Sequence, residues 1–243
     1  MGAVFVTGAT GTVGSAVVKH LLELGQPVIA GIRDPHDAGR VPDAAEARAF
    51  SFDDTPAVIE HALEGADRLF LMRPPAIADV QAKLFPVIDA ALRRGIGQIA
   101  FLSLQGVQAN RKTPHHAVEK YLREVRSPYT FLRPNFFMQN LSSTYAGPIR
   151  DRGEIFVPAG RSRTAFIDAR DVGRAAAATL TQPGHIGKAY TLSGAQSLSY
   201  RKVAEIMTAV LGRPIRYPRP SEADYLAQLA VNGAPADYIA VQK

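Results

Sequence analysis

Short apolar runs alternate with amphipathic stretches along the first half of the chain. The apolar runs are rich in β-branched and aromatic residues, whereas the stretches between them repeat their apolar positions at helical spacing. The pattern predicts six strands, at Ala3–Thr7, Pro27–Arg33, Arg48–Phe52, Asp67–Met72, Gln98–Ser103 and Tyr129–Arg133. It predicts helices at Thr12–Leu24, Asp79–Arg94 and Pro114–Arg126. Because strands alternate with crossover helices, we expect an α/β fold with a doubly wound, mostly parallel sheet of the Rossmann type.

The periodicity loosens after about residue 135. The elements expected there are a short strand at Ser162–Asp168, a helix at Ala169–Leu180, a strand at Ala189–Ser193, a helix at Ser199–Leu211 and a strand at Pro214–Tyr217. We therefore predict a dinucleotide-binding domain at residues 1–135 and a smaller α+β substrate region at 136–243, with 168–193 returning to the main domain. The smaller region is expected across the carboxyl ends of the strands, where such folds bind ligands.

Three glycines separate the first predicted strand from the helix behind it. Gly8 permits a tight turn, Gly11 lets the backbone approach a pyrophosphate, and Gly14 lets the helix pack closely on the strand. The amide groups at the helix start then face the negative charge. The predicted cofactor contacts are Gly8, Ala9, Thr10, Gly11, Thr12, Val13 and Gly14. No Gly-Lys-Ser/Thr follows, which excludes a Walker loop.

Composition and charge remove several chemistries. The 243-residue chain has no cysteine, which excludes disulfides, a thiol nucleophile and a thiolate metal site, and we expect no metal. No apolar run reaches the ~18 residues of a membrane span, and the N-terminus does not resemble a signal peptide, so we expect a cytoplasmic protein. The net charge of +6 is scattered along the chain. We therefore expect a positive field for an anionic cofactor and no nucleic-acid partner.

Several motifs together resemble the NmrA-like branch of the short-chain dehydrogenase/reductase superfamily. They span nearly the whole chain, at Thr7–Gly14, Gly31–Pro35, Phe70–Pro75, Phe131–Asn140, Phe166–Val172 and Tyr190–Gly194. The resemblance implies an NAD(P)-binding Rossmann fold in which Leu71 and Arg73 also contact the cofactor. It implies either an NADPH-dependent quinone reductase or a redox-sensing regulator with little or no turnover.

The residues after the second predicted strand bear on the choice between NADP(H) and NAD(H). Arg33 stands where the resemblance implies an arginine that pairs with the 2′-phosphate of NADP. In the alternative interpretation, Arg33 stacks on the adenine and Asp34 holds the ribose of NAD. The sequence favours NADP(H) and leaves NAD(H) open. The resemblance also implies that Asp53 reads the adenine amino edge, although Asp53–Thr55 fits a helix N-cap equally well.

The candidate catalytic group is Ser103, His116 and Lys120. Typical members of the superfamily carry Tyr-x-x-x-Lys at this spacing, and here His116 takes the place of the tyrosine. Lys120 is expected to hold the nicotinamide ribose. Three interpretations stay open: His116 donates a proton, water supplies the proton to a quinone-like acceptor, or the site only senses NADP(H). In a purely structural interpretation, His115 and His116 form a polar helix start, and Glu119 pairs with Arg123 at i,i+4.

The turn after the sixth predicted strand is expected beside the nicotinamide. The resemblance implies cofactor contacts from Pro134 and Asn135, followed by an apolar substrate wall from Phe136 and Phe137. In the alternative, the two aromatic residues are the core of a short helix. The leading hypothesis is an oxidoreductase that transfers hydride from NADPH to a small quinone-like or carbonyl acceptor. The rival is an NADP(H)-sensing regulator with a protein partner, and a homodimer is compatible with both.

Overall fold

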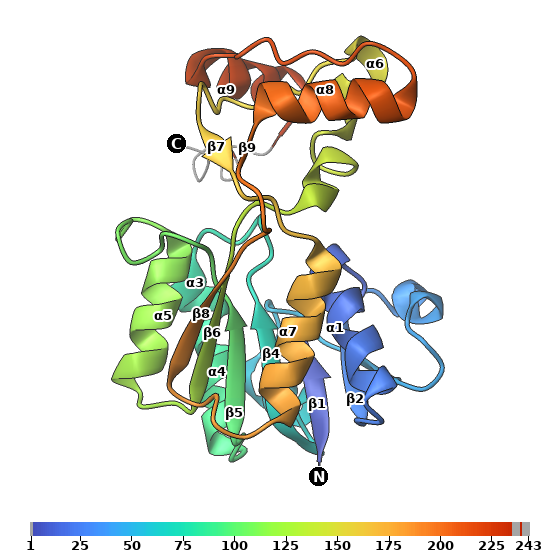
Figure 1. Ribbon diagram of the computed structural model, residues 1–243. Helices are drawn as coiled ribbons and strands as arrows, with labels where there is room; N and C mark the ends of the chain where they lie inside the picture. The colour runs from blue at the N-terminus through green and yellow to red at the C-terminus, as the bar shows by residue number, and fades with distance from the viewer. Residues whose placement is uncertain (1, 235–238, 240–243) are drawn as a thin grey trace. The chain divides into compact units, whose positions relative to one another are not determined.

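The computed structural model describes residues 2–234 and 239, which form two compact units. The first unit runs to Pro134 and resumes at Ala169–Leu192. The second unit comprises Asn135–Asp168 and the chain from Ser193 onward. Figure 1 shows the chain crossing between the units at these points.

The first unit is built on a seven-stranded sheet. Its strands are β1 (Ala3–Val6), β2 (Val28–Ile32), β3 (Glu46–Ala49), β4 (Ala66–Met72), β5 (Gln98–Leu102), β6 (Tyr129–Pro134) and β8 (Lys188–Leu192). The spatial order is β3-β2-β1-β4-β5-β6-β8, and every pair is parallel. The predicted doubly wound Rossmann-type sheet is confirmed, with β8 as a seventh strand beside β6.

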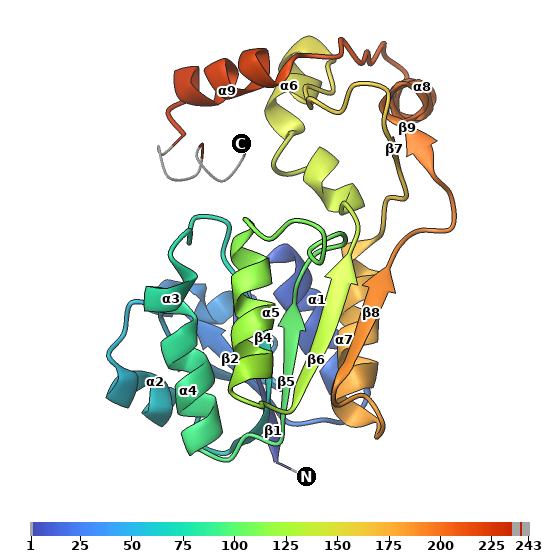
Figure 2. The ribbon, with the colours of Figure 1, turned by 90° about the vertical axis from the view of Figure 1, so that its left-hand side faces the viewer.

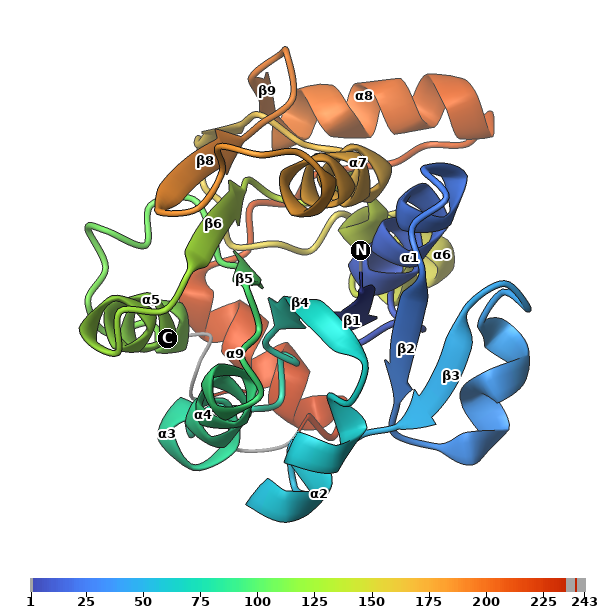
Figure 3. The same cartoon turned by 90° about the horizontal axis from the view of Figure 1, so that it is seen from below.

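Helices cover both faces of this sheet (Figures 2 and 3). One face carries α1 (Thr12–Glu23) and α7 (Ala169–Thr181), which contact each other so closely that a Cβ on Gly173 would lie 2.6 Å from the Cβ of Ala16. The other face carries α2 (Pro56–Ala62), α3 (Val80–Lys83), α4 (Phe85–Arg93) and α5 (Pro114–Glu124). The fully buried rings of Phe5, Phe101 and Phe131 belong to the apolar core on this second face.

Two predicted boundaries in the first unit were wrong. The helix expected at Asp79–Arg94 is interrupted at Leu84, because Pro86 lacks the amide N–H that would continue the first helix. The third strand ends at Ala49, before Phe50 and Phe52. The ring centroids of Phe5 and Phe50 are 5.3 Å apart, so Phe50 serves the core and does not extend the edge strand.

The second unit is smaller, and most of its regular secondary structure is helical. Its elements are η2 (Met138–Leu141), α6 (Ala146–Arg152), β7 (Arg163–Thr164), β9 (Leu198–Ser199), α8 (Tyr200–Leu211) and α9 (Glu222–Val231). The strand predicted at Pro214–Tyr217 was wrong, because only Arg216 bridges to Glu154. Pro214 has no amide hydrogen to extend that pairing. Within the described residues, no helix has the length and apolarity needed to span a membrane.

Candidate functional site

The glycine loop between β1 and α1 is a close-packed cradle. Gly8 has a φ of +61°, and a Cβ there would lie 2.5 Å from the Sδ of Met72. A Cβ on Gly14 would lie 2.0 Å from the carbonyl oxygen of Gly8. The hydroxyl of Thr7 fixes the start of the loop, because it donates to Phe70 O at 3.1 Å and accepts from the Met72 amide at 2.9 Å. The loop therefore has little freedom to change shape.

The N-terminus of α1 is left open for an anion. Its N-cap is Gly11, which supplies no side-chain hydrogen bond, and its first turn contains no acidic residue. The first amide groups of a helix have no partners inside the helix, and they carry the positive end of its dipole. Gly11 and Thr12 are exposed at this point. The loop and the helix start thus offer backbone donors to a pyrophosphate, as the sequence predicted.

Arg33 follows β2 and is exposed, and no hydrogen bond or ion pair engages its side chain among residues 2–234. Asp34 has a structural role instead. Its carboxylate accepts the His36 amide at 2.9 Å and caps the short 3₁₀ helix η1 (Pro35–Arg40). Capping occupies one carboxylate oxygen of Asp34, and the contact of Arg33 with the cofactor's 2′-phosphate stays a prediction.

Arg40, which the sequence analysis did not single out, lies against the glycine loop. Its guanidinium donates to Thr10 O at 2.9 Å and forms an ion pair with Asp37, also at 2.9 Å. No local sequence pattern predicts this contact, because the two residues lie thirty positions apart in the chain. The contact ties η1 to the loop and places a second cation beside it.

The structure shows the surroundings of three other expected cofactor residues, whose cofactor contacts stay a prediction. Leu71 is fully buried in β4, so its side chain belongs to the core and is not positioned to touch a ligand. Asp53 forms an ion pair with Lys83 and does not cap a helix, because the N-cap of α2 is Thr55. Arg73 donates from Nη1 to the carbonyl groups of Pro74 and Pro75, at 3.2 and 3.1 Å, whereas its buried Nε has no hydrogen-bond partner. An orphaned donor of this kind is costly unless a ligand or water meets it.

The inward face of α5 carries His115 and Glu119, together with the apolar Val118 and Leu122. These four residues follow the i, i+3, i+4, i+7 spacing of a buried helix face. The sequence contains this spacing, but the comparison with Tyr-x-x-x-Lys predicts functional roles for His116 and Lys120 and none for His115. The structure thus turns His115 toward the sheet, where its ring lies 6.1 Å from that of Phe101.

Glu119 is the centre of a buried ionic network. It is 2% exposed and accepts from Arg133 through two hydrogen bonds, of 2.9 and 2.6 Å. The Ser103 hydroxyl donates to it at 2.7 Å, and Arg123 donates at 2.9 Å. Burial alone would raise the pKa of Glu119, but the hydrogen bonds from Arg133 and Ser103 outweigh it and hold the pKa below its usual range. Ser103 is 4% exposed, so its hydroxyl positions Glu119 and does not face open space.

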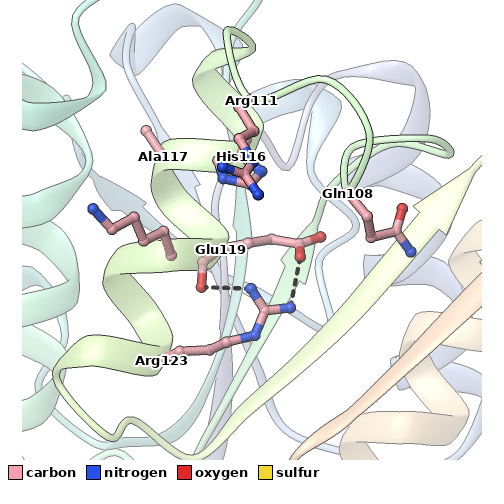
Figure 4. Close-up of a pocket in the computed structure, with 7 residues that line it drawn as sticks. Gln108, Arg111, His116, Ala117, Glu119 and Arg123 are labelled. Atoms are coloured by element: carbon pink, nitrogen blue, oxygen red, sulfur yellow. Dashed lines mark hydrogen bonds and ion pairs between the residues drawn. The ribbon is translucent and has the colours of Figure 1, made fainter.

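His116 and Lys120 lie on a different flank of α5, where they line a pocket with Gln108 and Arg111 (Figure 4). The ring Nδ1 of His116 lies 3.1 Å from Val107 O. Lys120 is 65% exposed and sits 3.5 Å from Glu124. No hydrogen bond between described residues joins either side chain to Ser103, whose hydroxyl donates to Glu119 instead. Their catalytic roles stay a prediction.

The turn after β6 begins with Pro134, whose carbonyl accepts the Gln105 amide at 3.0 Å. Asn135 opens the second unit, and its side chain accepts the amide of Phe136 at 2.7 Å. The ring of Phe136 packs inside the second unit, with centroids 5.7 Å from Tyr145 and 5.4 Å from Phe166. Phe136 therefore fits the core interpretation, and Phe137 forms a bridge to Ile167. Substrate contacts from either residue stay a prediction.

The burial of His115 should make the free energy of unfolding depend on pH in the acid range. Desolvation, with a further contribution from the charge of Arg73, lowers its pKa to about 3. The unfolded chain binds this proton near pH 6.5, so stability is retained above that pH and falls as the pH drops toward 3. We expect the free energy of unfolding to be about 1–2 kcal/mol lower at pH 5 than at pH 7 from this group alone.

Urea denaturation of His115→Gln at pH 7 and pH 5 checks this expectation. In the variant, the free energy of unfolding should fall less between the two pH values, because the contribution of His115 is absent. His61→Gln is the matched control, since the His61 side chain is 80% exposed. An unchanged pH dependence in His115→Gln would show that His115 is not held neutral by the fold.

Comparison with known proteins identifies similar sequences along almost the whole chain. A model of the NmrA-like family matches residues 2–240. The NAD(P)H azoreductase of Xenophilus azovorans is 35% identical over 220 residues, which are 88% of this chain and 76% of the azoreductase. Quinone oxidoreductase 2 of Escherichia coli is 28% identical over 236 residues, covering 95% of this chain and 82% of that protein.

Solved structures agree with these matches. An NADPH-dependent quinone oxidoreductase of Escherichia coli, complexed with NADPH, superposes with a TM-score of 0.84 at 28% identity, covering 98% of this chain and 86% of that chain. The triphenylmethane reductase of Citrobacter sp., complexed with NADP(H), gives a TM-score of 0.82 at 25% identity, covering 99% of this chain and 87% of that chain.

In the described part of this chain, no group of three or more His, Asp or Glu side chains is placed to hold a metal ion.

Proposed function

Since this chain belongs to the NmrA-like family, we propose that it is an NAD(P)H-dependent oxidoreductase that prefers NADPH and reduces a small quinone-like or carbonyl acceptor. The observation that carries the proposal is the glycine cradle joined to the uncapped start of α1, with Arg33 free at the end of β2. The names of the similar proteins, an NAD(P)H azoreductase and quinone oxidoreductases, support the same class of reaction.

The residues of the first unit fit a dinucleotide. The cradle has no room for a Cβ at Gly8, in the tight turn, or at Gly14, where the helix packs on the loop, and Gly11 is the glycine expected to let a pyrophosphate approach the backbone. The amides at the start of α1 would hold that pyrophosphate, and Arg33 would pair with a 2′-phosphate. The unpartnered Nε of Arg73 is one more donor for a ligand beyond β4. NADPH, when bound, supplies the hydride.

The proton for the acceptor has two candidate sources in this proposal. His116 remains the residue that the superfamily spacing indicates, and water is sufficient for a quinone-like acceptor. His115 is not a third source, because desolvation and the charge of Arg73 lower its pKa to about 3 and leave it neutral near pH 7. Lys120 and Asn135 as nicotinamide contacts belong to the same proposal, as does a cytoplasmic location.

The first experiment is the loss of absorbance at 340 nm with purified protein, NADPH or NADH, and a panel of quinones and aldehydes. Faster oxidation of NADPH with one acceptor class is the expected result. Tight NADPH binding without oxidation across the panel would contradict the enzyme proposal and favour the NADP(H) sensor.

Arg33→Ala should weaken NADPH binding by about 10- to 100-fold, as for a lost charged hydrogen bond of about 1.5–3 kcal/mol. NADH binding should hardly change, because NADH lacks the 2′-phosphate. Fluorescence titration with both cofactors measures the two affinities. Arg161→Ala, which removes the same charge from an exposed position in the second unit, is the control. An equal loss for NADPH and NADH would show that Arg33 does not read the 2′-phosphate.

A further inference from the structure

A pocket on the first unit holds two predicted catalytic residues, His116 and Lys120, but its other lining residues have no role in the proposed reaction so far. It has a volume of about 650 Å³ and lies between α5 and the loop that follows β5. We call it the basic pocket, and it is lined by Gln108, Arg111, His116, Ala117, Glu119, Lys120 and Arg123. None of these residues comes from the glycine loop, from η1 or from the end of β2, so the pocket is separate from the predicted pyrophosphate and adenosine-ribose contacts, and it shares only Lys120 with the predicted nicotinamide contacts.

The charges in and behind the basic pocket do not cancel. Glu119 is the only lining carboxylate, and it is shared by two guanidinium groups, those of Arg123 and the buried Arg133. This network therefore keeps one net positive charge. Arg111 adds a second. Lys120 is opposed only by the exposed Glu124 at 3.5 Å, a contact of the kind that contributes little.

Several donors around the pocket are also unused. Among residues 2–234, no hydrogen bond or ion pair engages the side chain of Arg111 or that of Gln108. In Figure 4, Gln108 lies across the hollow from α5, and the guanidinium of Arg123 is folded back toward Glu119.

We propose that the basic pocket binds a small molecule through an oxyanion, such as a phosphate, sulfonate or carboxylate. Its size is that of a small-molecule site. A planar guanidinium with free donors matches an oxyanion in geometry as well as in charge, so Arg111 is the expected anchor. Gln108 and Lys120 supply the neighbouring donors. The surplus positive charge of the lining is then neutralised by the occupant.

The site is tested by a chemical-shift titration of the full chain with phenyl phosphate. Shifts of the Gln108, Ala117 and Lys120 amides report binding in this pocket, whatever binds at the glycine loop. Arg111→Gln should raise the dissociation constant about tenfold or more, the loss typical of a charged hydrogen bond. Lys112→Gln is the matched control. It removes the same charge at the neighbouring position, and the Lys112 side chain does not line the pocket. It should change the constant less than about twofold.

Two results would overturn the proposal. One is the absence of saturable shifts in the wild-type chain up to about 10 mM phenyl phosphate, a limit far weaker than ordinary small-ligand affinities. The other is an equal weakening by Arg111→Gln and Lys112→Gln, which would indicate only a diffuse positive field. Melting curves of both variants show that each remains folded.

A second measurement separates two sources of the oxyanion and rests on the proposed function. If it is an acidic group of the hydride acceptor itself, Arg111→Gln should raise KM for a naphthoquinone sulfonate and not for unsubstituted naphthoquinone. If it is a free anion, KM should stay equal for both acceptors while phenyl phosphate still binds. Both results support the pocket, and the titration needs no turnover, so failure of the proposed reaction is distinguished from failure of the site.

Discussion

Replacing Glu119 by glutamine is expected to lower the free energy of unfolding by about 3–5 kcal/mol, the usual cost of breaking a buried ion pair. The variant removes the one negative charge that pairs with Arg133 among the described residues, and the Arg133 side chain is 9% exposed. The arginine then becomes a buried cation without a counter-charge. The glutamine amide would also present a donor where Ser103 and two arginines already donate. Urea denaturation at pH 7 measures the loss.

Glu124→Gln is the matched control, because Glu124 lies on the same helix but is 57% exposed. Its effect should stay within about 0.5 kcal/mol. The pKa of Glu119 is lowered in the folded protein, so its contribution is complete above the unfolded pKa near 4.3 and is lost as the pH falls through the lower folded value. Glu119→Gln should remove this acid-dependent part. Equal stability of the two variants would contradict a structural role for the network.

Gly14→Ala is expected to impair both the fold and cofactor use. The new Cβ would lie 2.0 Å from Gly8 O and 2.6 Å from Gly8 C, and both are backbone atoms that cannot rotate away. Either α1 or the glycine loop must move, which costs about 1–3 kcal/mol of stability for overpacking. A displacement of about 1 Å in the loop amides is sufficient to lower kcat/KM about 100-fold. NADPH and NADH should be affected alike, because the pyrophosphate is common to both.

Two neighbours separate these effects. Ser15→Ala changes an exposed residue of the same helix and should leave both properties intact. Gly11→Ala places its Cβ 3.2 Å from Gly8 O, on the exposed side of the loop, so it should reduce cofactor binding with a smaller cost in stability. Normal kcat/KM in Gly14→Ala would show that the loop does not hold the cofactor.

The fold was predictable because its signals are local. Alternating apolar runs and helical periods identify the strands of the sheet and most of their crossover helices, although not α2. The central strands are buried as expected, whereas the edge strands β3 and β8 are largely exposed. The second unit was harder to predict. Its two strands, β7 and β9, contain two residues each and pair residues more than thirty positions apart. So short a strand has no periodicity to detect.

The glycine loop was predictable because backbone geometry determines its shape. The residues on α5 were harder to assign, because the orientation of the helix determines which side chains face inward. The three glycines predicted the cradle, because their spacing alone indicates a steric requirement for glycine at each position. His115 and His116 are adjacent in sequence, and only the burial of Val118 and Leu122 shows which of them faces inward. Contacts such as Arg40 to Thr10 and Arg133 to Glu119 join distant segments, and no spacing rule identifies them.

The sheet of the first unit is completed late in synthesis. A nascent chain that has reached Asp168 already contains β1 to β6, but it lacks α7 and β8. Until those elements emerge, the face of α1 that meets Gly173 is exposed to water and β6 is an unpaired edge, the kind of surface on which other chains pair. The ribosome must therefore deliver all of the second unit's first segment, Asn135–Asp168, before the first unit can close, and throughout that interval the α1 face and the β6 edge are open to misassembly and to chaperone capture.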